Sequence, residues 1–172
     1  MQMKSMSLEP SEEPSDGRER RQADATATIT LLECGIGGCR FGVTTSHVIE
    51  IGEWTPGFLT PLPGAPAGIV GTIFFDGHAI VVLDLRQLFW PDDKWSESDA
   101  PMVMVIQYGP TPFAILVDGL IGIHDVPRDA IRSFTSLYVW GVKWLSGGAI
   151  LADRAISILD LEMLDQLRLW LP

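Results

Sequence analysis

The stretch that most restricts the fold is residues 54–75, which contains no Lys, Arg, Asp or Glu. Its apolar character suits a membrane span, but it is interrupted by Pro56, Pro61, Pro63, Pro66, Gly57, Gly64, Gly68 and Gly71. Each proline removes a helical hydrogen bond, and a bilayer offers the broken backbone no other partner. The stretch therefore predicts loops and strands in a soluble protein, with no direct insertion into a membrane.

Turn signals around this stretch predict an all-β fold with short helices. Asp76-Gly77 separates the apolar runs 68–75 and 78–83, which is a strong signal for a two-residue hairpin turn. The glycine-rich segment 35–38 predicts a hairpin between a strand that begins at Thr26 and a return strand at 40–43. A further hairpin is predicted from residues 102–106 and 113–117, and residues 120–126 are expected to extend it.

Two short helices are expected between the strands. Thr44, Thr45 and Ser46 supply capping hydroxyls, and Val48 and Ile51 are spaced three apart, as on one face of a short helix. Asp84 is placed to cap a helical turn over residues 85–89.

The length of 172 residues indicates one domain, and the 47% hydrophobic content is ample for a core. Residues 1–25 mix acidic and basic side chains and have almost no large apolar residues after Leu8, which predicts a disordered charged N-terminal tail. Residues 26–172 are expected to form the folded domain.

The charge of the chain points to a protein partner. A formal net charge of −10 would repel a phosphate backbone over most of the surface, which argues against nucleic-acid binding. Residues 1–24 lack the apolar stretch of a secretory signal, so we expect a cytoplasmic protein with reduced cysteines.

No pattern indicates catalysis, a metal or a cofactor. His47, His78 and His124 are isolated in sequence, and we expect each imidazole to be hydrogen-bonded or exposed. Cys34 and Cys39 flank the glycine turn and would sit near each other across a hairpin, but a metal site needs about two more ligands. We expect two buried or half-buried thiols, no cofactor and no enzymatic activity. Six tryptophans are present, and Trp140, Trp144 and Trp170 gather toward the end, as core residues or as interface anchors.

A segment near the end repeats an earlier one. Gly71, an apolar hairpin and Leu83-Asp84-Leu85 recur as Gly141, a longer apolar stretch and Leu159-Asp160-Leu161. The repetition predicts two related β units within one domain.

Four pieces of sequence, in order over residues 29–164, resemble the CheW-like domain. The most specific is Pro63-Gly64-Ala65-Pro66 with Gly71, followed by two strands and Val82-Leu83-Asp84-Leu85-Arg86, which is similar to the family's Pro-x-Ala-Pro-x-x-x-x-Gly and Pro-Val-x-Asp-Leu-Arg pattern. The others are His47-Val48-Ile49-Glu50-Ile51, Leu116-Val117-Asp118-Gly119-Leu120 and Ile158-Leu159-Asp160-Leu161.

The resemblance implies two five-stranded, SH3-like β-barrel subdomains and a non-catalytic adaptor. Such an adaptor couples chemoreceptors to a CheA-type histidine kinase, by binding the kinase's regulatory domain and the cytoplasmic tip of the receptor. By resemblance, the receptor-binding residues are Val48, Glu50, Gly71, Asp76 and Ile123. The kinase-binding residues are expected on the hairpin of residues 29–43 and next to it, namely Ile29, Val43 and Thr45.

The chain departs from the family pattern at the turn. Where the family has Asn-Leu-Arg-Gly, this chain has Phe74-Phe75-Asp76-Gly77, so an anion replaces a cation. The last hairpin, around residues 144–148, is expected to be longer than in the family.

Other functions remain open from the sequence. They are an adaptor of a non-motility chemosensory pathway that controls pili or development, and a β-barrel that binds a small ligand or single-stranded nucleic acid, for which the acidic surroundings of Trp90 and Trp95 are unfavourable.

Overall fold

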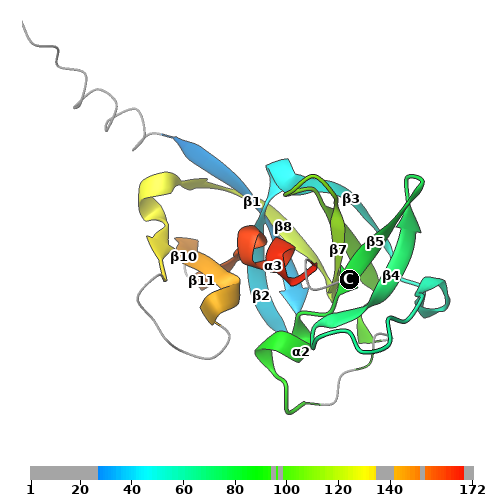
Figure 1. Cartoon of the computed structure of the whole chain (residues 1–172). Coiled ribbons are helices and arrows are strands. Elements are labelled where there is room, and N and C mark those ends of the chain that lie inside the picture. The colour runs from blue at the N-terminus through cyan, green and yellow to red at the C-terminus, as the bar shows by residue number, and fades with distance from the viewer. Residues whose placement is uncertain (1–26, 94–95, 97–98, 135–141, 152–153, 169–172) are drawn as a thin grey trace, which may run out of the picture.

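A computed structural model describes residues 27–93, 96, 99–134, 142–151 and 154–168 (Figure 1). The first sheet has the strand order β8 (Gly119–Pro127), β1 (Thr28–Ile36), β2 (Cys39–Thr44), β11 (Arg154–Leu159), β10 (Leu145–Leu151) and β9 (Arg132–Ser133). The second sheet has the order β3 (Val48–Glu53), β6 (Met102–Ile106), β7 (Phe113–Val117), β5 (His78–Leu83) and β4 (Ile69–Phe75). The helical segments are η1 (Thr45–His47), η2 (Pro56–Phe58), α2 (Arg86–Phe89), η4 (Arg128–Ala130), η5 (Val142–Trp144) and α3 (Leu161–Arg168).

Each sheet has its own small core, and a larger core lies between the sheets. Val82, Val105 and Leu116 belong to the core of the second sheet, whereas Leu31 and Ile156 belong to that of the first. The shared core combines residues from both sheets with one side of α3, which Figure 1 shows between the two halves. Alternate strand residues face opposite sides, so each central strand contributes to two cores at once.

The prediction of a short helix around Val48 and Ile51 is wrong. Only residues 45–47 are helical, as the single 3-10 turn η1, and residues 48–53 form strand β3 along β6. Val48, Ile49 and Ile51 are β-branched, which favours an extended strand wherever a neighbouring strand offers an edge.

Residues 120–126 do not extend the third hairpin, contrary to expectation. β7 already has β6 on one side and β5 on the other, so neither edge of β7 is open to β8. The chain instead crosses at Asp118 to the first sheet, where β8 pairs antiparallel with β1.

The prediction that Gly141 is the counterpart of Gly71 in the sequence repeat is wrong. The ladder of β10 and β11 matches that of β4 and β5 position by position, with a bulge before Gly147 in one and before Gly71 in the other. Gly147 and not Gly141 is therefore the counterpart of Gly71, and each is the same number of positions ahead of its aspartate, Asp160 or Asp84. The last hairpin is thus not longer than the first, because the extra residues precede its ladder.

The N-terminal tail expected over residues 1–25, together with Trp140 and Trp170, lies outside the described residues. Trp144 is buried in the shared core.

Candidate protein-interaction site

Two strands occupy equivalent edge positions in the two sheets. β3 ends the second sheet and β8 ends the first. Each is bulged at one isoleucine, Ile49 in β3 and Ile121 in β8, and these side chains are 48% and 44% exposed. Ile123, further along β8, is 67% exposed. An edge strand with exposed apolar side chains is a ready surface for another chain, so these strands form the candidate site.

Three of the residues expected to bind the receptor lie on these edge strands. Val48 is half-buried against the shared core, and Glu50 is exposed two positions further along β3. Ile123 pairs with Leu32, which belongs to the same shared core. Because paired residues project to the same face of a sheet, Ile123 and Val48 both border the shared core, one from each sheet.

Asp76 lies at the tip of the β4–β5 hairpin and is exposed. Its φ of 44° and the φ of 82° at Gly77 are the two positive values that a type I′ turn requires. The structure confirms the hairpin predicted from Asp76-Gly77, and it directs the anionic side chain to the surface.

Gly71 is buried at the bulge of β4, where a side chain would not fit. A Cβ there would lie 2.5 Å from the carbonyl oxygen of Thr60. The counterpart Gly147 has the same restriction, with a Cβ position 2.5 Å from the carbonyl oxygen of Arg132. Gly71 therefore has a packing role of its own, which allows residues 59–60 to lie against β4.

The residues expected to bind the kinase have different exposures. Ile29 is half-buried near the open end of the β1–β2 hairpin. Thr45, also half-buried, donates its hydroxyl hydrogen to the carbonyl oxygen of Thr30 at 3.1 Å, which ties η1 to this end. Val43 is fully buried in the shared core, so its side chain supports the hairpin from inside.

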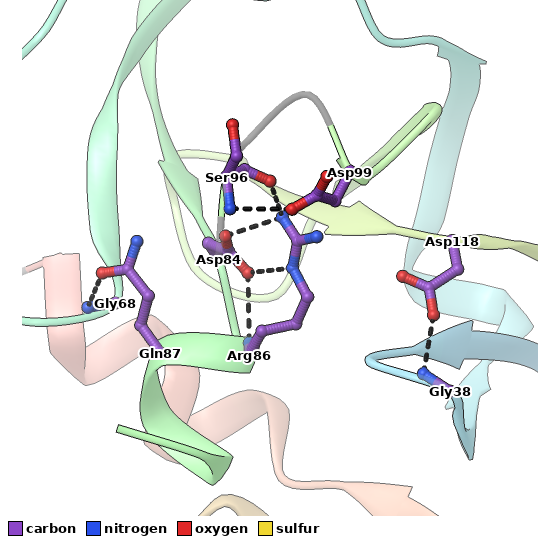
Figure 2. Close-up of polar contacts among 8 residues, drawn as sticks. All are labelled: Gly38, Gly68, Asp84, Arg86, Gln87, Ser96, Asp99 and Asp118. Carbon is purple, nitrogen blue, oxygen red and sulfur yellow. Dashed lines mark hydrogen bonds and ion pairs between the residues drawn. The ribbon is translucent and has the colours of Figure 1, made fainter. Parts of the chain in front are cut away.

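A buried ion pair, which the sequence did not predict, braces the family motif around Asp84. Figure 2 shows the Arg86 guanidinium donating to both carboxylate oxygens of Asp84, each at 2.8 Å. Asp84 also accepts a hydrogen bond from the backbone N–H of Arg86, as expected for a residue that caps α2. Burial alone would lower the pKa of Arg86, but the hydrogen bond and charge of Asp84 raise it.

Asp118 performs a second structural role that the motif alone did not show. It accepts a hydrogen bond from the backbone N–H of Gly38 at 2.9 Å (Figure 2). Its own backbone N–H donates to the carbonyl oxygen of Gly35 at 2.8 Å. Asp118, the residue directly after β7, thus holds the β1–β2 turn and so connects the two sheets.

Glu33 is the other buried charge that sequence reasoning missed. Its carboxylate is fully buried in β1 and contacts Arg40, His124 and Arg154 at 3.3, 2.7 and 2.9 Å. Burial would raise the pKa of Glu33, but the hydrogen bonds from Arg154, His124 and Arg40 outweigh it and hold the pKa below its usual value. These partners come from β11, β8 and β2, so the cluster fixes the edge strand β8 to the rest of the first sheet.

The histidines are hydrogen-bonded or exposed, as predicted. His47 Nδ1 lies 2.9 Å from the carbonyl oxygen of Gln107, and exposed His78 contacts the carbonyl oxygen of Asp76. His124 belongs to the Glu33 cluster. Among the described residues, no group of three or more His, Cys, Asp or Glu is arranged to hold a metal ion.

The expectation of two buried or half-buried thiols is right for Cys34 and wrong for Cys39. Both are free thiols, but Cys39 is exposed at the start of β2. The register pairs Cys34 with Phe41 and not with Cys39, so the two sulfurs are not cross-strand neighbours. Burial and nearby carboxylates raise the pKa of Cys34 to about 12.

A two-sheet β fold with exposed apolar edges, and without a metal cluster in its described part, is typical of a protein-interaction module. The family model of the CheW-like domain matches residues 30–167, and the chain belongs to this family. In the described part of the chain, no helix is long and apolar enough to span a membrane.

The chain is similar to two curated proteins. It is 24% identical to "Chemotaxis protein CheW" of Klebsiella aerogenes over 143 residues, covering 83% of this chain and 84% of that protein. It is 28% identical to "Chemotaxis protein CheA" of Bacillus subtilis over 87 residues, which are 51% of this chain and only 12% of that protein. The chain thus resembles most of the first protein and a small part of the second.

A solved structure has the same fold. The scaffolding protein CheW from Thermoanaerobacter tengcongensis matches with a TM-score of 0.68 and 18% identity, over 78% of this chain and 90% of that one. The match and the two sheets confirm the predicted all-β fold with SH3-like subdomains. The first sheet has six strands instead of the expected five, because the two-residue strand β9 pairs with the edge of β10. Together with the family assignment, they identify a non-catalytic adaptor of chemotaxis signalling and do not favour the ligand-binding or non-motility alternatives.

Proposed function

We propose that this adaptor links the cytoplasmic tip of a chemoreceptor to the regulatory domain of a CheA-type histidine kinase, in the cytoplasm. The observation that carries the proposal is the apolar surface of the two edge strands, where Ile49, Ile121 and Ile123 are all substantially exposed. A receptor tip that packs between these strands would cover apolar side chains that otherwise face water.

The kinase's regulatory domain is proposed to bind the β1–β2 hairpin and the adjoining η1. The similarity to a small part of a CheA protein supports this partner, because it indicates that the kinase carries a related fold. Ile29 and Thr45 are the members of the expected set with side chains partly at the surface.

Asp76 distinguishes this chain from the family pattern, which has an arginine in this turn. An anion at the hairpin tip repels an acidic surface and attracts a basic one, by up to several kcal/mol if the contact is desolvated. We infer that the partner surface opposite Asp76 is basic, or that an ordinary receptor tip binds weakly.

Calorimetry with a receptor-tip fragment and with the kinase regulatory domain tests the proposal. Asp76→Arg should strengthen binding to an ordinary receptor tip and weaken binding to the protein's own partner, with both effects shrinking as salt rises. Asp76→Gln is the matched control, because it imposes a similar backbone cost at a positive φ without the new charge. No binding to any CheA-type kinase of the source genome would refute the adaptor function, and equal affinities of all Asp76 variants at low salt would refute the role of the charge.

A further inference from the structure

A groove in the second sheet shares only Glu50 with the proposed receptor site. It encloses about 290 Å³ between β3, η2 and β4. Ile73, Phe75 and Val105 form its apolar floor, since all three belong to or pack against the core of that sheet. Glu50, Glu53 and Phe58 stand on its rim, and the Phe58 side chain is 74% exposed.

The internal repeat indicates which chemistry suits this position. In the second sheet, Val105 pairs with Ala114, which in turn pairs with Val82 of β5. The first sheet has the same arrangement, since Glu33 pairs with Gly42, which in turn pairs with Ile158 of β11. Val105 therefore takes the place of Glu33. In the first sheet this place is filled by a carboxylate with arginines around it.

In the second sheet the nearest carboxylate on this face is that of Glu50, on the edge strand β3. Glu50 pairs with Val105 and therefore projects to the same face of the sheet. No ion pair of Glu50 or Glu53 is found within the described part of the chain, and the sequence has no Lys or Arg between Arg40 and Arg86 or within residues 100–117. The groove thus combines an apolar floor with carboxylates that have no lysine or arginine from their own sheet.

The chain does contain an arginine-rich segment, at residues 18–21, with the sequence Arg-Glu-Arg-Arg. An arginine side chain has an apolar stem and a guanidinium that binds carboxylates, and it stacks favourably on aromatic rings. An apolar floor, two glutamates and an exposed phenylalanine are complementary to both parts of such a side chain.

We propose that residues 18–21 of the chain's own N-terminal segment dock into this groove, with arginine stems on Phe58 and guanidinium groups at Glu50 and Glu53. Residues 27–29 are held against β8, so the free tether of Arg18 is the eight residues 19–26, which can span up to about 28 Å. The path runs from Ala27 along β1 to Thr30, crosses the contact of Thr30 with Thr45, and continues to Glu50. Its two chain segments are three and five residues long, and they are shorter than a fully extended chain because η1 rises only about 2 Å per residue. The tether and the path are therefore of comparable length. Linkage within one chain also gives a millimolar effective concentration, so a weak contact is sufficient.

Docking at Glu50 would make the N-terminal segment a competitor of the receptor, a consequence that rests on the proposed function. The contact itself does not depend on it. Removing the arginines should therefore strengthen receptor-tip binding several-fold and leave kinase binding unchanged.

NMR spectra of the full chain test the contact directly. Arg18→Gln, Arg20→Gln and Arg21→Gln combined should shift the amide resonances of residues 50–53 and 73–75, and added salt should produce the same shifts in the unmodified chain. The matched control neutralises three acidic residues of the same segment: Glu9→Gln, Glu12→Gln and Glu13→Gln. In a second variant, Glu50→Gln with Glu53→Gln, adding the three arginine substitutions should no longer shift the amide resonances of the groove residues.

Each result decides the proposal. Groove shifts specific to the arginine variant, independent of protein concentration, support docking within one chain. The same shifts with the control variant, or none with either, overturn it. Shifts that grow with concentration also overturn it, because they assign the groove to the segment of a second copy. If the shifts are present but receptor tips do not bind, the contact stands and the proposed receptor function fails.

Discussion

Replacing Asp84 by alanine should destabilise the protein severely. The carboxylate and the Arg86 guanidinium are 0% and 1% exposed, and two hydrogen bonds of 2.8 Å join them. Asp84→Ala removes the carboxylate that accepts two hydrogen bonds from this buried guanidinium, and breaking a buried ion pair by removing one partner typically costs about 3–5 kcal/mol. It also removes the acceptor for the backbone N–H of Arg86 at the start of α2.

The internal repeat supplies a matched control for this prediction. Asp160 occupies the corresponding place before α3 and accepts a hydrogen bond from the backbone N–H of Met163 at 3.0 Å, but it is half-buried and forms no ion pair with another described residue. Asp160→Ala should therefore cost only the value of a helix cap, about 1 kcal/mol. The difference between the two variants measures the ion pair apart from the cap.

Urea unfolding followed by tryptophan fluorescence provides the measurement, with the slope checked for each variant so that the free energies are comparable. The double variant Asp84→Leu with Arg86→Met removes both charges and should be more stable than Asp84→Ala alone. If Asp84→Ala costs no more than Asp160→Ala, the buried pair does not contribute in the way that its geometry implies.

Three further predictions concern pH, thiol chemistry and the N-terminal segment. Because the pKa of Glu33 is lowered in the folded state, its contribution to stability should be present above the ordinary glutamate pKa and lost as the pH falls through the folded value; Glu33→Gln should flatten this acid limb in thermal melts, and an unchanged limb would exclude the cluster as its source. Iodoacetamide at pH 8 should modify exposed Cys39 and spare buried Cys34, as read by peptide mass spectrometry, and equal labelling of both in the folded protein would contradict the burial. Deleting residues 1–24 should lower the melting temperature by less than about 5 °C, since these residues offer little apolar surface; a larger drop in calorimetry would show that they belong to the folded core.

Local signals in the sequence were sufficient for several elements. Asp76-Gly77 specified its hairpin because a type I′ turn requires positive φ at both central residues, and few residue types adopt it. Asp84 indicated the start of α2 because a capping side chain bonds to a backbone group two residues away. The family motif was readable for the same reason, since its residues restrict their own neighbours.

Strand pairing could not be read in this way. The β-branched run at Val48 fits a short helix or a strand until β6 provides an edge for it. β8 follows β7 directly in sequence but pairs with β1, because β7 has no open edge. The hairpin counterpart of Gly71 was mistaken for Gly141, since only the ladder shows which glycine stands at the bulge.

The residues of the candidate site show the same difference between local signals and long-range packing. Sequence resemblance was enough to name Glu50, Asp76 and Ile123, all of which are exposed, but not to recognise that Val43 and Gly71 are buried. In the Glu33 cluster, His124 lies 91 positions and Arg154 lies 121 positions from Glu33 along the chain, and no spacing rule predicts such contacts. Turns and caps depend on bonds between near neighbours, whereas edges, burial and ion pairs depend on which distant strands share a sheet, and that is decided only when the whole chain is packed.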